Sequence, residues 1–193
     1  MSAHFGRAVP VALRRFPALF GQTLTGNKVV VPECFPDKGF HLVSLNFKNK
    51  HVWNALTWNG LASSLDLVAQ HSNQQSVEMY YVWLFPLIHR LWAPIWRKRC
   101  RQWATERAID HSQVISVYGD RDAICEQIGI HNDGRQYAFL VTQTGKILFG
   151  SDGRYQSHKH DFHIHKAIKI SPIPTQIGQD ETSSEKPKQL YSN

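Results

Sequence analysis

The sequence lacks two features that would place it in a familiar structural class: a paired cysteine pattern and a long apolar run. Its 193 residues include only Cys34, Cys100 and Cys125, an odd number without C-x-x-C spacing. This indicates neither a disulfide framework nor a zinc ribbon, and it favours a reducing compartment. A transmembrane helix needs about 18 consecutive apolar residues, and the longest apolar stretches, Tyr80 to Phe85 and Leu91 to Trp96, are far shorter. We therefore expect a soluble or peripheral protein.

The sequence also lacks the motifs that bind nucleotides or hold a catalytic serine. It contains no G-x-x-x-x-G-K-[ST], G-x-G-x-x-G or G-x-S-x-G. The sequence thus contains none of the motifs that usually indicate ATP hydrolysis, a Rossmann cofactor or an α/β-hydrolase nucleophile. No pair of carboxylates points to acid–base catalysis either. The sequence predicts no catalytic residue and no cofactor.

What the sequence does have is enough apolar content, 42%, for one compact domain, together with a net charge of +7. The charge lies in two places. Residues 86–110 hold six Arg or Lys against two acids, and residues 1–32 hold four basic residues and no acid, so each carries +4 and the rest sums to about −1. We read residues 1–15 as a basic tail or a short presequence, and 16–155 as the domain.

The first half of the domain reads as alternating strands and helices. A turn at Gly26-Asn27 precedes a short strand ending at Val31, and the apolar run Phe40 to Phe47 predicts a strand buried on both faces. A helix is expected from Trp53 to a point between His71 and Gln75, with Trp53 and Val68 on its buried face. The segment from Val77 to Phe85 predicts a second strong strand.

The second half begins with apolar residues at helical spacing from Leu87 to Ile109, where Pro94 either kinks a helix or marks its start. A strand at 114–118, a short helix with Asp120 as its N-cap and a hairpin at 137–150 follow. The order β-α-β-α-β-α-β-β predicts an α/β protein, a three-layer α/β/α sandwich with a mixed sheet and a C-terminal β-hairpin. Residues 156–193 read as a tail, His-rich at first and disordered from 177 to 193.

This order resembles the thioredoxin-like fold, and the segment FPALFGQTLTGNKVVVP is similar to a peroxiredoxin-type opening. In redox members of that superfamily a catalytic Cys lies in the loop after the first buried strand, at a helix N-terminus that stabilises its thiolate. Here that loop, residues 48–54, has no Cys, and residues 132–136 lack the Pro that precedes the penultimate strand in the superfamily. Thiol–disulfide exchange is therefore not the expected activity.

Four segments resemble the mitochondrial ATP synthase assembly factor family and its bacterial relatives: LVSLNF with its Trp-containing helix, the strand running into Pro86, ISVYGDRDAICEQIGI and QYAFLVTQTGKILFGSDG. The resemblance implies a non-catalytic binding or assembly factor whose partner is a membrane-embedded ATP synthase subunit. It also implies the matrix side of the mitochondrial inner membrane in a eukaryote. In a bacterium it implies the cytoplasm or the periphery of the inner membrane.

The segment 92–103 is the strongest candidate for a contact surface, because it combines three Trp with four cations. Such a helix suits an anionic membrane interface, a partner helix or RNA, and it equally suits a helix of the fold with a buried Trp face. The residues expected to make contact are Trp92, Trp96, Arg97, Lys98, Arg99 and Arg101.

Two alternatives remain open at this point. One is an atypical peroxiredoxin-like thiol oxidoreductase that uses Cys34 or Cys100, and the other is an RNA-binding or ribosome-associated protein. The only metal-like cluster is His158, His160, His163 and His165, whose H-x-H spacing on a strand would put pairs of imidazoles on one face. Because nothing else supplies a second ligand pair, we expect no metal site there.

Overall fold

The computed structural model describes residues 15–37, 39–63, 65 and 77–170. Two predictions fall outside this range: the basic tail or presequence at 1–15, apart from Arg15, and the disorder expected from 177 to 193. The distal end of the helix expected to begin at Trp53 lies outside it as well.

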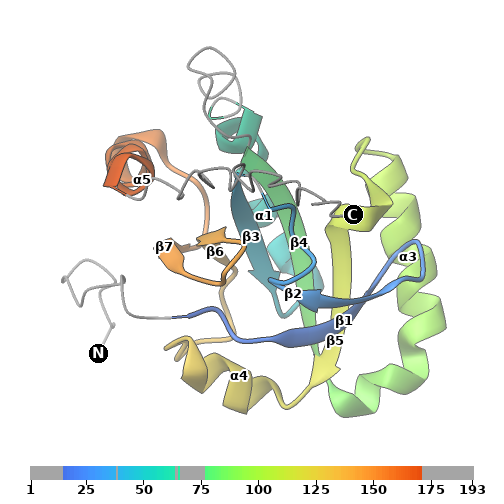
Figure 1. Ribbon diagram of the computed structural model, residues 1–193. Helices are drawn as coiled ribbons and strands as arrows, with labels where there is room; N and C mark the ends of the chain where they lie inside the picture. The colour runs from blue at the N-terminus through green and yellow to red at the C-terminus, as the bar shows by residue number, and fades with distance from the viewer. Residues whose placement is uncertain (1–14, 38, 64, 66–76, 171–193) are drawn as a thin grey trace, which may run out of the picture.

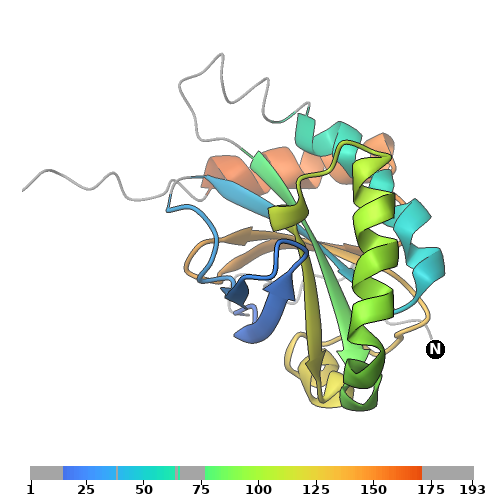
Figure 2. The same cartoon turned by 90° about the vertical axis from the view of Figure 1, so that its right-hand side faces the viewer.

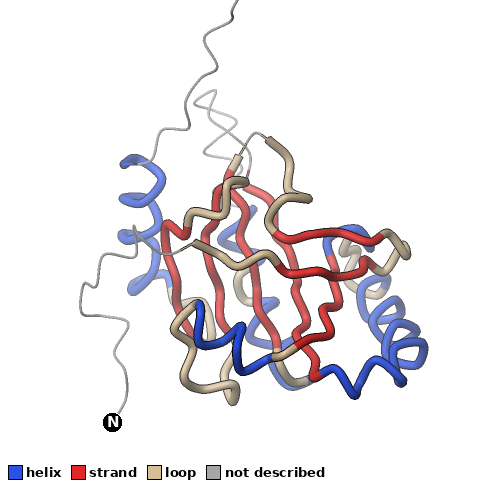
Figure 3. The backbone as a smooth tube through the Cα atoms, turned by 60° about the horizontal axis from the view of Figure 1, so that its bottom comes forward, coloured by secondary structure: helices blue, strands red, loops and turns tan. Residues whose placement is uncertain are grey.

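A seven-stranded mixed sheet forms the centre of the molecule, in the order β2-β1-β5-β4-β3-β6-β7 (Figures 1 and 3). The parallel strands β3 (Phe40–Asn46), β4 (Val77–Pro86) and β5 (Val114–Gly119) lie in the middle. Two antiparallel hairpins flank them: β1 (Leu19–Thr23) with β2 (Lys28–Val31), and β6 (Tyr137–Thr142) with β7 (Ile147–Asp152). The mixed sheet and the C-terminal hairpin are confirmed.

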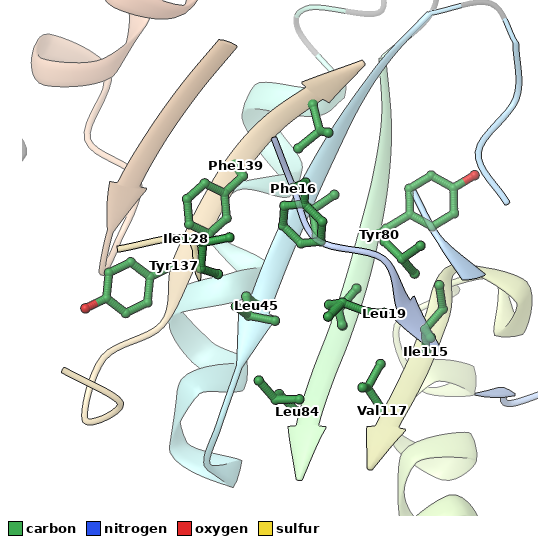
Figure 4. Packing of buried hydrophobic residues seen from close by; sticks show 14 of the residues in the cluster. Phe16, Leu19, Leu45, Tyr80, Leu84, Ile115, Val117, Ile128, Tyr137 and Phe139 are labelled. Atoms are coloured by element: carbon green, nitrogen blue, oxygen red, sulfur yellow. The ribbon is translucent and has the colours of Figure 1, made fainter. Parts of the chain in front are cut away.

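Helices cover both faces of the sheet, which confirms the three layers. Helices α1 (Val52–Leu56), α3 (Ala93–Thr105) and α5 (Ser157–Ile170) lie over one face, where Ala55, Cys100 and Ile164 join one buried cluster (Figure 2). Helix α4 (Arg121–Gln127) and the segment before β1 cover the other face, and Figure 4 shows the second cluster beneath them. Every residue of β3 is buried and its apolar side chains are divided between the two clusters, as its mostly apolar sequence predicts.

The helix predicted from Trp53 is interrupted after Leu56, and Trp58 is the buried tryptophan in place of Trp53. Helix α1 ends at Leu56, where the Thr57 hydroxyl and backbone N–H both donate to the carbonyl of Asn54. Residues 59–63 are again helical. Trp58 is 0% exposed, whereas Trp53, which was expected inside, is 62% exposed. The predicted buried face was right at Leu61 and Leu65, which are 2% and 4% exposed, and wrong at Trp53. A face through Trp53 and a face through Trp58 both reach Leu61 and Leu65 at helical spacing, so the period alone does not choose between them.

The domain does not end near residue 155, because the His-rich segment forms helix α5 and packs against β7. Its inward side is formed by His160, Ile164 and Ile168, at a spacing of four residues. The histidines concealed this helical period, since they made the segment look polar. Reading 156 onward as a tail is therefore wrong as far as residue 170.

The segment from Leu87 onward divides into a 3₁₀ helix, η3 (Leu87–Trp92), and helix α3, with Pro94 in the first turn of α3. Pro94 thus marks the start of the helix. Asp120 caps α4 as predicted: its Oδ1 accepts hydrogen bonds from the backbone N–H groups of Asp122 and Ala123, at 3.1 and 3.2 Å.

Candidate binding site at the carboxyl edge of the parallel strands

The loop after β3, where a redox relative would carry its cysteine, holds a buried histidine. His51 ends the 3₁₀ helix η2 (Asn49–His51) and is 2% exposed. The backbone N–H of Phe47 donates to its Nδ1 at 3.2 Å, so Nε2 carries the proton and donates to the carbonyl of Gly134 at 3.1 Å. His51 therefore ties the β3–α1 loop to the loop before β6. Its role is structural, because both ring nitrogens are engaged by backbone groups.

Three buried histidines share this neutral state. Desolvation by burial lowers the pKa of His41, His51 and His160 below the ordinary value of 6.5. His41 approaches the carbonyl of Pro36, and His160 accepts the backbone N–H of Gln156 and contacts the hydroxyl of Ser151. Each imidazole is thus held uncharged within the fold.

We expect these histidines to make the protein sensitive to mild acid. Because their pKa values are lowered on folding, the unfolded chain takes up protons first, so their contribution is complete above pH 6.5 and is lost as the pH falls through the folded pKa values. Urea unfolding from pH 8 downward should show constant stability above about 6.5 and a steady decline below it.

The pH range in which stability falls separates the effect of the three histidines from that of carboxylates. The hydrogen bond from the backbone N–H of Ser112 lowers the pKa of Asp110 from 3.8, so its contribution is lost only at much lower pH. A stability that stays flat between neutral pH and about 5 would contradict neutral burial of the three histidines.

Beside this loop, the carboxyl ends of β3, β4 and β5 open into a groove of about 350 Å³, which we call the aromatic groove. Its walls come from the strand ends and from η3 and α3: Phe47, Asn49, Phe85, His89, Trp92, Trp96 and Tyr118. The Phe85 ring stacks on Tyr118 at 5.4 Å, and Trp96 meets Phe85 edge-on at 4.8 Å and Trp83 at 4.9 Å. These contacts fix the aromatic rings in place, so the groove is pre-formed.

An apolar ridge borders the aromatic groove. It consists of five exposed side chains from η3 and the first turn of α3: Leu87, Ile88, Leu91, Trp92 and Ile95. Leu91 is 83% exposed and Ile88 is 71% exposed. These make up five of the eight large apolar side chains exposed in the described part of the chain. Such a concentration of exposed apolar side chains between residues 87 and 95 is typical of a surface that binds a partner.

The structure assigns different positions to the six residues expected to make contact. Trp92 is exposed on the ridge, and Lys98 and Arg99 are exposed on α3. Trp96 is half-buried in the wall of the groove. Arg97 donates to Oε1 of Gln22, and Arg101 donates to the carbonyl of Leu24 from Nε at 3.0 Å and from Nη2 at 2.7 Å. These two arginines hold α3 against the β1–β2 hairpin. That the six form a contact surface remains a prediction.

The strand-end residues of the groove, Phe47, Phe85 and Tyr118, were not among the predicted site residues. A signal for them exists, since ligands of open α/β sheets bind beyond the carboxyl ends of the strands. Each of these aromatics lies at or just after the end of a predicted parallel strand. The rule would have selected them.

The three thiols lie apart in the fold and their environments oppose ionisation. Cys34 is exposed in the turn after β2, while Cys100 is buried in α3 and Cys125 in α4. Desolvation raises the pKa of Cys34, raises that of Cys100 to about 12 and raises that of Cys125 to about 11. A nucleophilic thiol needs the opposite shift. The cationic sequence neighbours of Cys100 do not activate it.

The histidine cluster does not form the predicted strand face. Residues two apart on helix α5 point to different sides, and His160 turns inward to stack on Trp58 at 4.9 Å. His158, His163 and His165 stay exposed. Within the described residues, no group of three His, Cys, Asp or Glu side chains is placed to hold a metal ion.

Comparison with known proteins establishes the fold but no family within it. No protein-family model matches the chain. No curated protein sequence matches it either. Among solved structures, yeast Sco1 with copper bound matches with a TM-score of 0.51 at 12% identity, over 82% of this chain and 95% of that chain. BsSco, a member of the Sco family of cytochrome c oxidase assembly proteins, matches with a TM-score of 0.50 at 13% identity, over 83% and 95%.

A putative thioredoxin from Neisseria meningitidis matches over 87% of this chain and 99% of its own, with a TM-score of 0.47 and 15% identity. The two Sco structures together with the strand order show that the chain has the thioredoxin-like fold. Among the described helices, none has both the length and the apolar character required to span a bilayer.

Proposed function

We propose that this chain is a non-catalytic binding factor that assists assembly of the membrane sector of ATP synthase. The observation that carries the proposal is the aromatic groove with its apolar ridge, at the sheet edge where redox relatives place a cysteine. Here the edge carries fixed aromatic rings and a histidine engaged by the backbone. A binding groove thus lies at the position where redox relatives have a catalytic cysteine.

The groove suits an apolar protein segment of the kind that a membrane subunit exposes before assembly. Aromatic side chains supply most of the binding energy at protein interfaces, and Trp92 is the aromatic that is 63% exposed at the rim. The fold also occurs in assembly proteins, since BsSco belongs to a family of cytochrome c oxidase assembly proteins. The four sequence segments named above direct the proposal to ATP synthase.

The test is co-purification from detergent-solubilised native membranes. We expect the wild-type chain to retain a membrane-sector subunit of ATP synthase, and Trp92→Glu to reduce the recovered amount at least about tenfold, as expected for loss of an interface hot spot. Trp53→Glu is the matched control, because Trp53 is exposed to the same degree, 62% against 63%, but does not line the groove. Absence of every ATP synthase subunit, or equal recovery with Trp92→Glu, would overturn the proposal.

A variant without thiols separates this proposal from thiol oxidoreductase activity. We expect Cys34→Ser/Cys100→Ala/Cys125→Ala to keep its partner and its ability to support ATP synthase assembly in cells, since none of the thiols lines the groove. Circular dichroism establishes that the variant is folded. A folded variant that no longer supports assembly would contradict a non-catalytic role.

A further inference from the structure

A second hollow adjoins the aromatic groove at the η3–α3 junction. This cavity, of about 590 Å³, is lined by the β1–β2 hairpin, β5, η3 and α3. Three cations from three different elements line it: Lys28 of β2, Arg90 of η3 and Arg97 of α3. We call it the cationic cavity. Tyr118 lines both hollows, so the two adjoin.

The charge of this cavity is not balanced within the described part of the protein. No Asp or Glu is among its lining residues, and Lys28, Arg90 and Arg97 form no ion pair with the described carboxylates. Three like charges around one hollow repel one another, and an anion placed among them removes that cost. The cavity thus has the electrostatics of an anion site.

One of the three cations is held in place. Gln22 accepts from Arg97 and, through its Nε2, donates to the carbonyl of Gly26 at 2.7 Å, which fixes the guanidinium to the hairpin turn. Ser116 and Tyr118, which each carry a hydroxyl group, also line the hollow. Guanidinium and hydroxyl donors around one space match the oxygens of a phosphate group.

The surroundings of the cavity indicate the source of that phosphate. Arg90 belongs to the same 3₁₀ turn as Leu87, Ile88 and Leu91 of the apolar ridge, and Phe20, 75% exposed, lines the cavity itself. Figure 2 shows this turn at the tip of the molecule, below α3. A phosphate site edged by projecting apolar side chains is complementary to a bilayer surface, where phosphates lie directly above acyl chains.

We propose that the cationic cavity binds the phosphate of an anionic phospholipid while the apolar ridge enters the membrane interface. This goes beyond the proposed function, since it requires no partner protein. It also gives the groove a position: with the ridge in the interface, the aromatic groove lies at the bilayer surface.

The test is sedimentation of the purified full chain with vesicles of phosphatidylcholine, alone or mixed with phosphatidylserine. We expect binding to the mixed vesicles to exceed binding to phosphatidylcholine at least about tenfold, and Lys28→Glu/Arg90→Glu to remove that preference. Lys159→Glu/Lys166→Glu is the matched control, because it makes the same change of charge at exposed residues of α5, outside the cavity. Equal losses in the two double variants would mean that general surface charge, not the cavity, binds the membrane, and would overturn the proposal.

Further arms distinguish the sources of the anion. Ile88→Ser/Leu91→Ser should abolish vesicle binding but keep the stabilisation of the protein by inorganic phosphate in a thermal melt. Stabilisation by phosphate without vesicle binding by the wild type would show a soluble-anion site and contradict the lipid. Binding of RNA in place of vesicles, lost in Lys28→Glu/Arg90→Glu, would also contradict it. Co-purification from detergent extracts does not depend on the bilayer, so this proposal and the proposed function can fail separately.

Discussion

Replacing Trp58 by alanine should lower the free energy of unfolding by about 3–5 kcal/mol, the usual cost of removing a large buried aromatic. Trp58 is 0% exposed, and its indole N–H donates to the carbonyl of Gly153 at 3.0 Å. Its ring lies 5.4 Å from Tyr155 and 4.9 Å from His160. The variant therefore loses core volume and also the contacts that join the α1 segment to β7 and α5. Urea unfolding followed by circular dichroism measures the loss.

Trp53→Ala is the control for this variant. Trp53 is the same residue type five positions earlier, but it lies on the surface with the guanidinium of Arg107 5.5 Å from its ring centre. Loss of an exposed cation–π contact costs about 0.5–1 kcal/mol. The loss of unfolding free energy should therefore be several times larger for Trp58→Ala than for Trp53→Ala. Similar losses for both would contradict the burial of Trp58 and the exposure of Trp53.

The second large effect is expected for His51→Ala. This substitution leaves the backbone N–H of Phe47 and the carbonyl of Gly134 without their partner, and an unsatisfied buried polar group costs about 1–3 kcal/mol. The variant should also show a weaker fall of stability below pH 6.5, because one of the three histidines with a lowered pKa is gone. The loss of stability alone would fit any packing defect, whereas the change in pH dependence is specific to a neutral imidazole.

His131→Ala serves as the control, since His131 is exposed and lies near the same loop. We expect its stability to stay within about 0.5 kcal/mol of the wild type. A His51→Ala variant with the acid sensitivity of the wild type would contradict the burial of His51 as a neutral imidazole.

Much of the fold could be predicted because its strongest signals are local. A strand buried on both faces is a mostly apolar run, which is how Phe40 to Phe47 reads. The cap of α4 needs only the side chain of Asp120 and the backbone two and three residues later. Pro94 marks the start of α3 because its ring cannot occupy a helix interior.

The candidate site could be predicted only in part, because it combines residues distant in the sequence. Trp92 and the cations of α3 attracted attention as a local cluster, whereas Phe47, Phe85 and Tyr118 meet only when three parallel strands align. Arg97 and Arg101 looked equivalent to Lys98 and Arg99. Only the position of the β1–β2 hairpin shows that the first two hold the fold together.

The sequence by itself determined the alternation of strands and helices from β3 to the C-terminal hairpin, the absence of a cysteine from the loop after β3 and the concentration of positive charge in residues 86–110. These depend on residue identity and on periods of a few residues. Tertiary structure decided the order of the strands in the sheet, which tryptophan of the first helix is buried, that the histidines belong to a packed helix, and that the basic segment carries exposed apolar side chains beside two hollows. Burial depends on what packs from elsewhere in the chain, and no local period contains that information.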